Sequence, residues 1–137
     1  MSDPWLQSFG PNPQASVRLF CFAHAGGGAA AYRLWHQGLP RHIEVWAIQL
    51  PGRAHRLREP ALRSIPAIVA ALLPSILPRL DRPFALFGHS MGSMIAFALA
   101  HELLKRGAPA PAHLFVSGRR GPGVPSAEPP LHVLPDA

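Results

Sequence analysis

The chain has 137 residues, of which 48% are hydrophobic, and its 13 basic and 7 acidic side chains give a formal net charge of +6. This length and composition predict a single folded domain and exclude a disordered chain. The sequence has no apolar run long enough to cross a membrane and no apolar segment near Met1 typical of a signal peptide. The single cysteine, Cys21, excludes an internal disulfide, so we expect a cytoplasmic protein.

Short apolar segments alternate with segments of helical character along the chain. Residues 17–23, 43–49, 83–87 and 112–117 have the length and composition of buried strands. Helices are predicted over residues 29–37, 64–80 and 93–106. Ser64 is the expected N-cap of the second helix, Pro74 and Pro78 should kink it or end it early, and Gly107 should end the third. The alternation predicts an α/β fold with a mainly parallel sheet.

The composition changes from Gly118 onward to glycine, proline and serine. This change predicts that residues 118–137 form a connector without a regular element. We also expect the last predicted strand, residues 112–117, to expose an edge that later strands of such a sheet normally cover, which should make the protein poorly soluble.

The pentapeptide Gly88-His89-Ser90-Met91-Gly92 lies between a predicted strand and a predicted helix. Gly-x-Ser-x-Gly is a weak signal alone, but this strand–turn–helix setting is typical of a nucleophile elbow. Glycine at 88 and 92 removes Cβ atoms that would clash at so sharp a turn, and the Met91 N–H points to where an oxyanion would form. Ser90 is therefore the candidate nucleophile; the alternative is a tight structural turn with an incidental serine.

A second glycine-rich turn, His24-Ala25-Gly26-Gly27-Gly28, follows the first long strand. An oxyanion hole needs a second backbone donor from such a loop, and we assign it to the Ala25 N–H. His24 and Gly26 would support the geometry of this loop, and His89 that of the elbow. A phosphate-binding loop is disfavoured because no lysine followed by serine or threonine is present, and a purely structural turn stays open.

Five motifs in register resemble one family, the type II thioesterases of nonribosomal peptide and polyketide synthesis. They are Phe22 to Ala29, Leu50-Pro51-Gly52-Arg53, the pentapeptide at Ser90, Ser117-Gly118-Arg119-Arg120 and His132 to Asp136. Ala54 departs from the pattern, since the family usually has an acid at this position. The resemblance implies an α/β-hydrolase fold.

The resemblance also implies an activity and a partner. Such an enzyme hydrolyses acyl groups from the phosphopantetheine arm of carrier proteins, with Ser90 forming an acyl-enzyme. Carrier proteins are usually acidic, so a basic surface could assist encounter, although the arginines form no single basic run. We expect no cofactor of its own, no nucleic acid and no membrane as partners. We also expect no metal, because the histidines lack metal-ligand spacing.

The base and acid of a triad are not evident after Ser90. The order in this fold is Ser, then Asp or Glu, then His. The residues available are Glu102, Glu128, Asp136, His101, His113 and His132, and none of them gives a convincing pair. By resemblance, base, acid and lid lie beyond residue 137. Residues 1–137 would then be the N-terminal part of one domain, with 118–137 leading to the lid.

On this interpretation the 137-residue chain should not turn over acyl thioesters above background, because only oxyanion binding remains. Two alternatives stay open. One is a non-catalytic fragment that at most binds carrier protein, and the other is a general esterase of the same fold.

Overall fold

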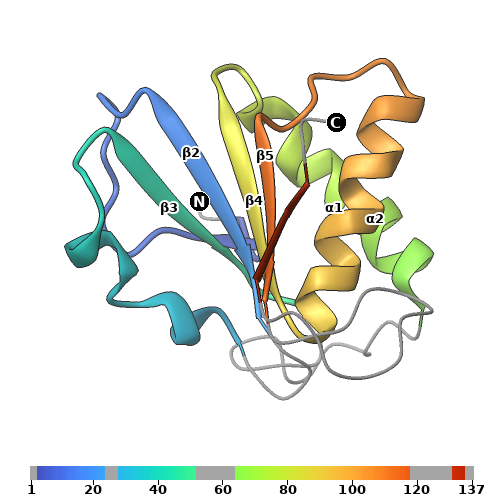
Figure 1. Ribbon diagram of the computed structural model, residues 1–137, viewed down its shortest axis with the longest axis horizontal. Helices are drawn as coiled ribbons and strands as arrows, with labels where there is room; N and C mark the ends of the chain where they lie inside the picture. The colour runs from blue at the N-terminus through green and yellow to red at the C-terminus, as the bar shows by residue number, and fades with distance from the viewer. Residues whose placement is uncertain (1–2, 24–27, 52–63, 118–130, 135–137) are drawn as a thin grey trace.

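A six-stranded sheet lies at the centre of the computed structural model, which describes residues 3–23, 28–51, 64–117 and 131–134 (Figure 1). The strands are β1 (Leu6–Gln7), β2 (Val17–Phe22), β3 (Ile43–Ile48), β4 (Phe84–His89), β5 (His113–Ser117) and β6 (Leu131–Leu134), in the order β1-β3-β2-β4-β5-β6. The four central strands are parallel, and β1 and β6 pair antiparallel at the two edges. The predicted α/β fold with a mainly parallel sheet is confirmed.

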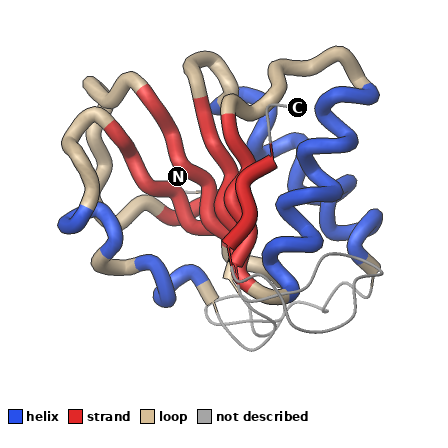
Figure 2. The backbone as a smooth tube through the Cα atoms, in the orientation of Figure 1, coloured by secondary structure: helices blue, strands red, loops and turns tan. Residues whose placement is uncertain are grey.

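Two α-helices, α1 (Ile65–Ile76) and α2 (Met91–Lys105), cover one face of the sheet (Figure 2). Alternate strand residues point to this face, and Phe20 and Leu86 pack there against Leu72 and Leu99 with all four fully buried. Burying each such side chain contributes about 1.5–3 kcal/mol to folding. Neither these helices nor any shorter one in the described ranges has the length and hydrophobicity needed to cross a bilayer.

The opposite face carries two short 3₁₀-helices, η1 (Ala29–Tyr32) and η2 (Trp35–Gly38). The prediction of one α-helix over residues 29–37 is therefore wrong. Backbone N–H groups here donate to the third residue back, as Ala31 does to Gly28. Tertiary contacts decide this geometry, because the buried Tyr32 ring packs at 4.7 Å from Trp35 and its hydroxyl donates to the Phe22 carbonyl.

The ends of both α-helices follow the sequence signals. Ser64 caps α1 by accepting a hydrogen bond from the Ala67 N–H at 3.2 Å. The helix runs through Pro74 and ends at Ile76, where the 3₁₀-helix η4 (Leu77–Arg79) follows. Gly107, with φ of +70°, ends α2, and the next N–H returns to the Leu103 carbonyl. These capping predictions are confirmed.

Strand β6 contradicts two expectations about the region after Gly118. Leu131–Leu134 forms a regular element, although its proline-rich surroundings predicted none. It pairs antiparallel with β5, with Ser117 opposite Leu131 and Leu114 opposite Leu134. The edge of β5 is therefore covered rather than exposed, because the tetrapeptide itself contains no proline and can form backbone hydrogen bonds to a neighbouring strand.

Candidate active site

Ser90 lies at the junction of β4 and α2 with φ of 57° and ψ of −122°. Among the described residues it is the one non-glycine residue with positive φ. An L-residue in such a region carries strain of about 1–3 kcal/mol. This conformation places Ser90 at the carboxyl edge of the sheet, directly before the first N–H groups of α2. The predicted elbow geometry is present.

Gly88 and Gly92 permit this turn because there is no room for a side chain at either position. A Cβ added at Gly92 would lie 2.2 Å from the Phe22 carbonyl oxygen, and one at Gly88 would lie 2.4 Å from the Gly92 oxygen. Both contacts are with backbone, which cannot move aside as a flexible side chain can. The predicted reason for glycine at these two positions is confirmed.

Neighbouring elements hold the turn. The Ser90 N–H donates to the carbonyl oxygen of Ser117, the last residue of β5, at 2.9 Å. Met91 is the first residue of α2, so its N–H has no acceptor within the helix and lies at the positive end of the helix dipole. His89 is half-buried at the end of β4. This part of the site can present one oxyanion donor beside the serine.

The second predicted donor, Ala25, lies outside the described residues, as do His24 and Gly26. The residues on both sides of this segment are anchored. The carbonyl oxygen of Phe22 accepts a hydrogen bond from the Tyr32 hydroxyl at 2.7 Å, and the Ala29 N–H donates a hydrogen bond to Gln49 Oε1 at 2.9 Å. Gln49 is 1% exposed and directly precedes the Leu50-Pro51 pair. The sequence analysis assigned no role to Gln49. Its position was a usable signal, because it is the one amide side chain at the end of a mainly apolar predicted strand, residues 43–49.

The other acids and histidines near Ser90 in sequence lie away from it. Glu102 is twelve residues along α2, which corresponds to about 18 Å along the helix axis. Arg106 donates to the Glu102 carboxylate at 2.7 Å, and this hydrogen bond holds the pKa of the carboxyl below its usual range. His113 lies at the far end of β5. Within the described residues, no hydrogen bond to Ser90 Oγ is formed.

A groove of about 380 Å³ between α1 and α2 is separate from the elbow. Its lining includes Val69, Leu73, Phe97 and His101, and none of residues 88–93. It is therefore not part of the candidate site.

Two further kinds of residue could have contributed to the site: the single cysteine, and a cluster of side chains able to bind a metal. Cys21 is fully buried in β2, where burial raises the pKa of its thiol, so it belongs to the core and not to the candidate site. Within the described ranges, no group of three or more His, Cys, Asp or Glu side chains could hold a metal ion.

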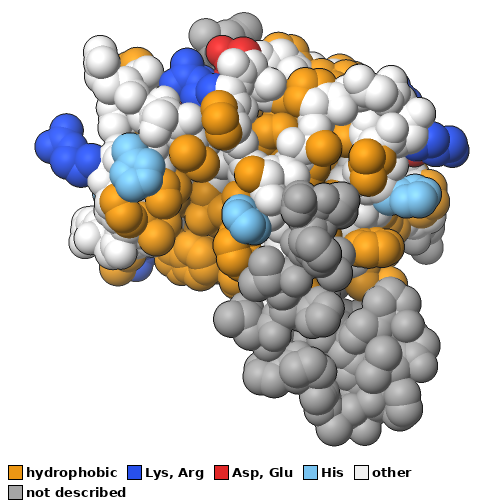
Figure 3. Space-filling view, turned by 45° about the horizontal axis from the view of Figure 1, so that its top comes forward, with side chains coloured by type: hydrophobic (Ala, Val, Ile, Leu, Met, Phe, Trp, Pro, Cys, Tyr) orange, Lys and Arg blue, Asp and Glu red, His pale blue; other side chains and the backbone are white. Residues whose placement is uncertain are grey.

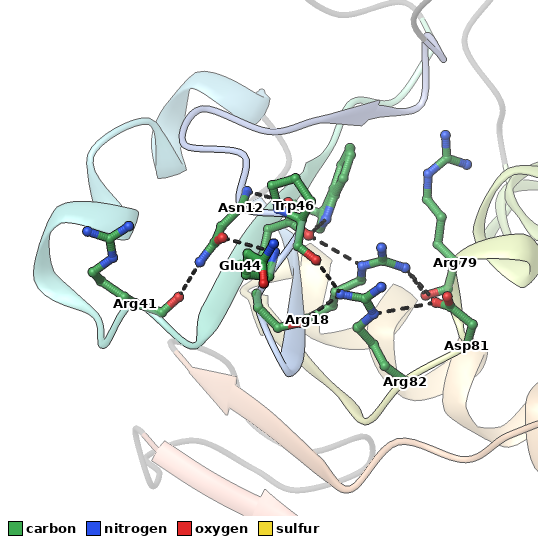
Figure 4. A network of polar contacts seen from close by, with 11 residues as sticks. Asn12, Arg18, Arg41, Glu44, Trp46, Arg79, Asp81 and Arg82 are labelled. Carbon is green, nitrogen blue, oxygen red and sulfur yellow. Dashed lines mark hydrogen bonds and ion pairs between the residues drawn. The ribbon is translucent and has the colours of Figure 1, made fainter.

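Part of the basic charge has a structural use at the amino ends of the parallel strands, away from Ser90 (Figure 4). Arg18 bonds to the buried Glu44 at 3.3 Å and to Asp81 at 2.8 Å. Glu44 also accepts from Trp46 Nε1 at 2.9 Å and from the Asn12 N–H at 2.8 Å. On the face shown in Figure 3, lysine and arginine side chains are scattered rather than gathered in one patch.

A strained serine between a parallel strand and a helix, with obligatory glycines on both sides, defines the class. The protein has the α/β-hydrolase fold, in a form typical of serine hydrolases.

Comparison with known proteins identifies the family. The model of the thioesterase domain family matches residues 17–132, so the chain belongs to this family. The gramicidin S biosynthesis protein GrsT of Aneurinibacillus migulanus is 44% identical over 132 residues, which are 96% of this chain and 52% of GrsT. The resemblance to type II thioesterases of nonribosomal peptide and polyketide pathways is confirmed.

Similarity to solved structures supports the same family. The type II thioesterase BorB from the borrelidin biosynthetic cluster superposes with a TM-score of 0.77 at 39% identity, covering 85% of this chain and 47% of BorB. The thioesterase RedJ from the prodiginine pathway of Streptomyces coelicolor gives a TM-score of 0.72 at 44% identity, covering 75% of this chain and 39% of RedJ. The chain spans about half the length of the curated relatives that it matches.

Proposed function

We propose that this protein acts as a thioesterase that hydrolyses acyl groups from the phosphopantetheine arm of carrier proteins in nonribosomal peptide or polyketide synthesis. The observation that carries the proposal is the strained Ser90 at the β4–α2 junction, in a chain that belongs to the thioesterase family. Relatives named for antibiotic biosynthesis support the substrate class.

In the proposed reaction Ser90 Oγ attacks the carbonyl carbon of the thioester. The C–S bond then breaks, the phosphopantetheine thiol leaves with a proton, and Ser90 carries the acyl group as an ester. Water attacks this ester, releases the acid and restores the serine. The N–H groups of Met91 and Ala25 hold the oxyanion during both the acylation of Ser90 and the hydrolysis of the acyl-enzyme. The loops that present these N–H groups are supported by His24, Gly26 and His89.

The general base and its carboxylate partner are assigned to the part of the family's length that this chain does not span. A histidine from one strand end and an acid from another would complete the triad. The phosphopantetheine belongs to the partner, so the enzyme needs no cofactor or metal of its own. Carrier proteins in the cytoplasm are the proposed partners, with no role for nucleic acid or membrane.

A chimera tests this proposal. Residues 1–137 are joined to the remaining half of GrsT, and free thiol is measured after mixing with an acyl-phosphopantetheinyl carrier protein. We expect hydrolysis by the chimera, loss of at least a thousandfold in the Ser90→Ala chimera, and no turnover by residues 1–137 alone.

Two outcomes would count against the proposal. A folded chimera that leaves the acyl carrier intact, while it cleaves simple oxygen esters, would favour a general esterase. Turnover by residues 1–137 that Ser90→Ala does not affect would remove Ser90 from its role.

A further inference from the structure

We propose that Ser93 is a positioning residue for the nucleophile: its hydroxyl holds the carbonyl group of Ser90 and keeps that residue in its strained conformation. This inference rests on the proposed function, since it concerns the same serine. Ser93 itself does not touch the reacting atoms.

The Ser90 carbonyl oxygen has two donors from one residue. Ser93 Oγ donates to it at 2.6 Å, and the Ser93 N–H donates to it at 2.9 Å. A carbonyl oxygen has two lone pairs, so this pair of bonds uses its full capacity. The carbonyl belongs to the residue with φ of 57° and ψ of −122°. Both bonds therefore fix the orientation of the peptide group that follows the strained torsion.

The surroundings of Ser93 leave its hydroxyl little choice of partner. Ser93 is 6% exposed, so water cannot readily replace the Ser90 carbonyl. Its backbone packs against β4, because a Cβ added at Gly88 would lie 2.5 Å from Ser93 Cα. Strand and helix thus meet at Ser93. A hydroxyl at this contact can restrain the turn between the two elements without occupying the space above Ser90.

The Ser90 N–H is fixed from another direction by the Ser117 carbonyl of β5 at 2.9 Å. The peptide groups on both sides of Ser90 are consequently anchored, one by a neighbouring strand and one by the first turn of α2. Without the Ser93 hydroxyl, a single N–H would hold the second of them. Relaxation of the strained φ would then become easier and would also weaken the bond to Ser117.

The test compares Ser93→Ala with Ser93→Thr, which restores a hydroxyl able to reach the carbonyl three residues back. Ser75→Ala in α1 is the matched control, because Ser75 is partly buried and lies outside the elbow. The first readout is the rate at which a fluorophosphonate probe labels Ser90 in the chimera with the remaining half of GrsT, which supplies the general base; labelling is measured by intact mass. In this reaction the oxygen–phosphorus bond forms, fluoride leaves and the hydroxyl proton passes to the general base.

The second readout needs no reactivity: amide hydrogen exchange by NMR at the Ser90 N–H, with Leu99 in the middle of α2 as internal reference. We expect Ser93→Ala to slow labelling about tenfold and to speed Ser90 exchange about tenfold, with Leu99 changed less than twofold. Ser93→Thr should largely restore the wild-type labelling rate and the wild-type Ser90 exchange rate, and Ser75→Ala should change neither rate.

Other results overturn the inference. Ser93→Ala with wild-type labelling and wild-type Ser90 exchange would show that the hydroxyl restrains nothing. Faster exchange throughout α2 would show a general structural role instead. If the wild-type chimera with the remaining half of GrsT is not labelled at Ser90, the proposed function loses support, while exchange at the Ser90 amide of the 137-residue chain still decides the role of Ser93.

Discussion

The carboxyl ends of the parallel strands form one edge of the sheet and their amino ends form another, and these two edges are stabilised in different ways. At the carboxyl edge, Gly88 and Gly92 allow backbone to approach backbone, and Ser90 carries conformational strain. At the amino edge, Arg18 and Glu44 are largely removed from water and are joined by ion pairs and hydrogen bonds. At the carboxyl edge, close backbone packing restricts which residues fit, whereas at the amino edge the partly buried charges require oppositely charged partners.

The difference indicates where function can reside. Strain persists only where the surrounding structure enforces it, and it is commonly found at functional sites. The pairs at the amino edge instead satisfy buried charges, whose role is to keep loops and strands together. Substitutions at the two edges should therefore differ in what they change: reactivity and stability at the carboxyl edge, stability alone at the amino edge.

The largest effect is expected for Gly92→Ala. Its Cβ would lie 2.2 Å from the Phe22 oxygen, so β2 and α2 must separate, which should lower the free energy of unfolding by about 3 kcal/mol. Urea denaturation measures this. Gly38→Ala is the control, because nothing lies within 4 Å of the added Cβ, and a change within about 0.5 kcal/mol is expected. Equal effects of the two variants would contradict the crowding at the elbow.

Glu44→Ala should destabilise the protein by about 2 kcal/mol, because it leaves the Trp46 and Asn12 donors without their acceptor and Arg18 with Asp81 alone. In the chimera with the remaining half of GrsT, the rate of fluorophosphonate labelling of Ser90 per folded molecule should stay within twofold of wild type. A slower rate at unchanged folded fraction would show that the two edges are coupled.

Ser90→Gly should raise the free energy of unfolding by about 1 kcal/mol, since glycine adopts positive φ without strain and loses some of that gain to backbone entropy. Ser90→Ala removes the hydroxyl but keeps the strain, so it should be the less stable of the two variants. Thermal and urea denaturation compare them. Equal stabilities would mean that the elbow stores no strain.

The smallest effect concerns the pair of Glu102 and Arg106, which belongs to neither edge. The hydrogen bond from Arg106 lowers the pKa of Glu102 in the folded state. The pair therefore stabilises the helix end above the unfolded pKa of Glu102, and this contribution is lost as the pH falls through the folded pKa. An NMR titration should give a lower midpoint for wild type than for Arg106→Gln; identical midpoints would show that the bond does not form in solution.

The sequence by itself determined the parts of the molecule that contiguous residues build. The strand before Ser90, the two glycines and the first turn of the helix after it are contiguous, within residues 84–94, so the elbow could be predicted from local pattern. The caps at Ser64 and Gly107 have the same origin, because each depends on hydrogen bonds between residues a few positions apart.

Only the tertiary structure decided the contacts between residues distant along the chain. The bond from Ser90 to Ser117, the bond from Ala29 to Gln49 and the pairing of β6 with β5 join separate elements, and no local pattern specifies their partners. The same holds for the two 3₁₀-helices, where Tyr32 packing overrides a helical pattern. Local propensity selects elements, whereas burial and hydrogen-bond satisfaction between elements select how they meet.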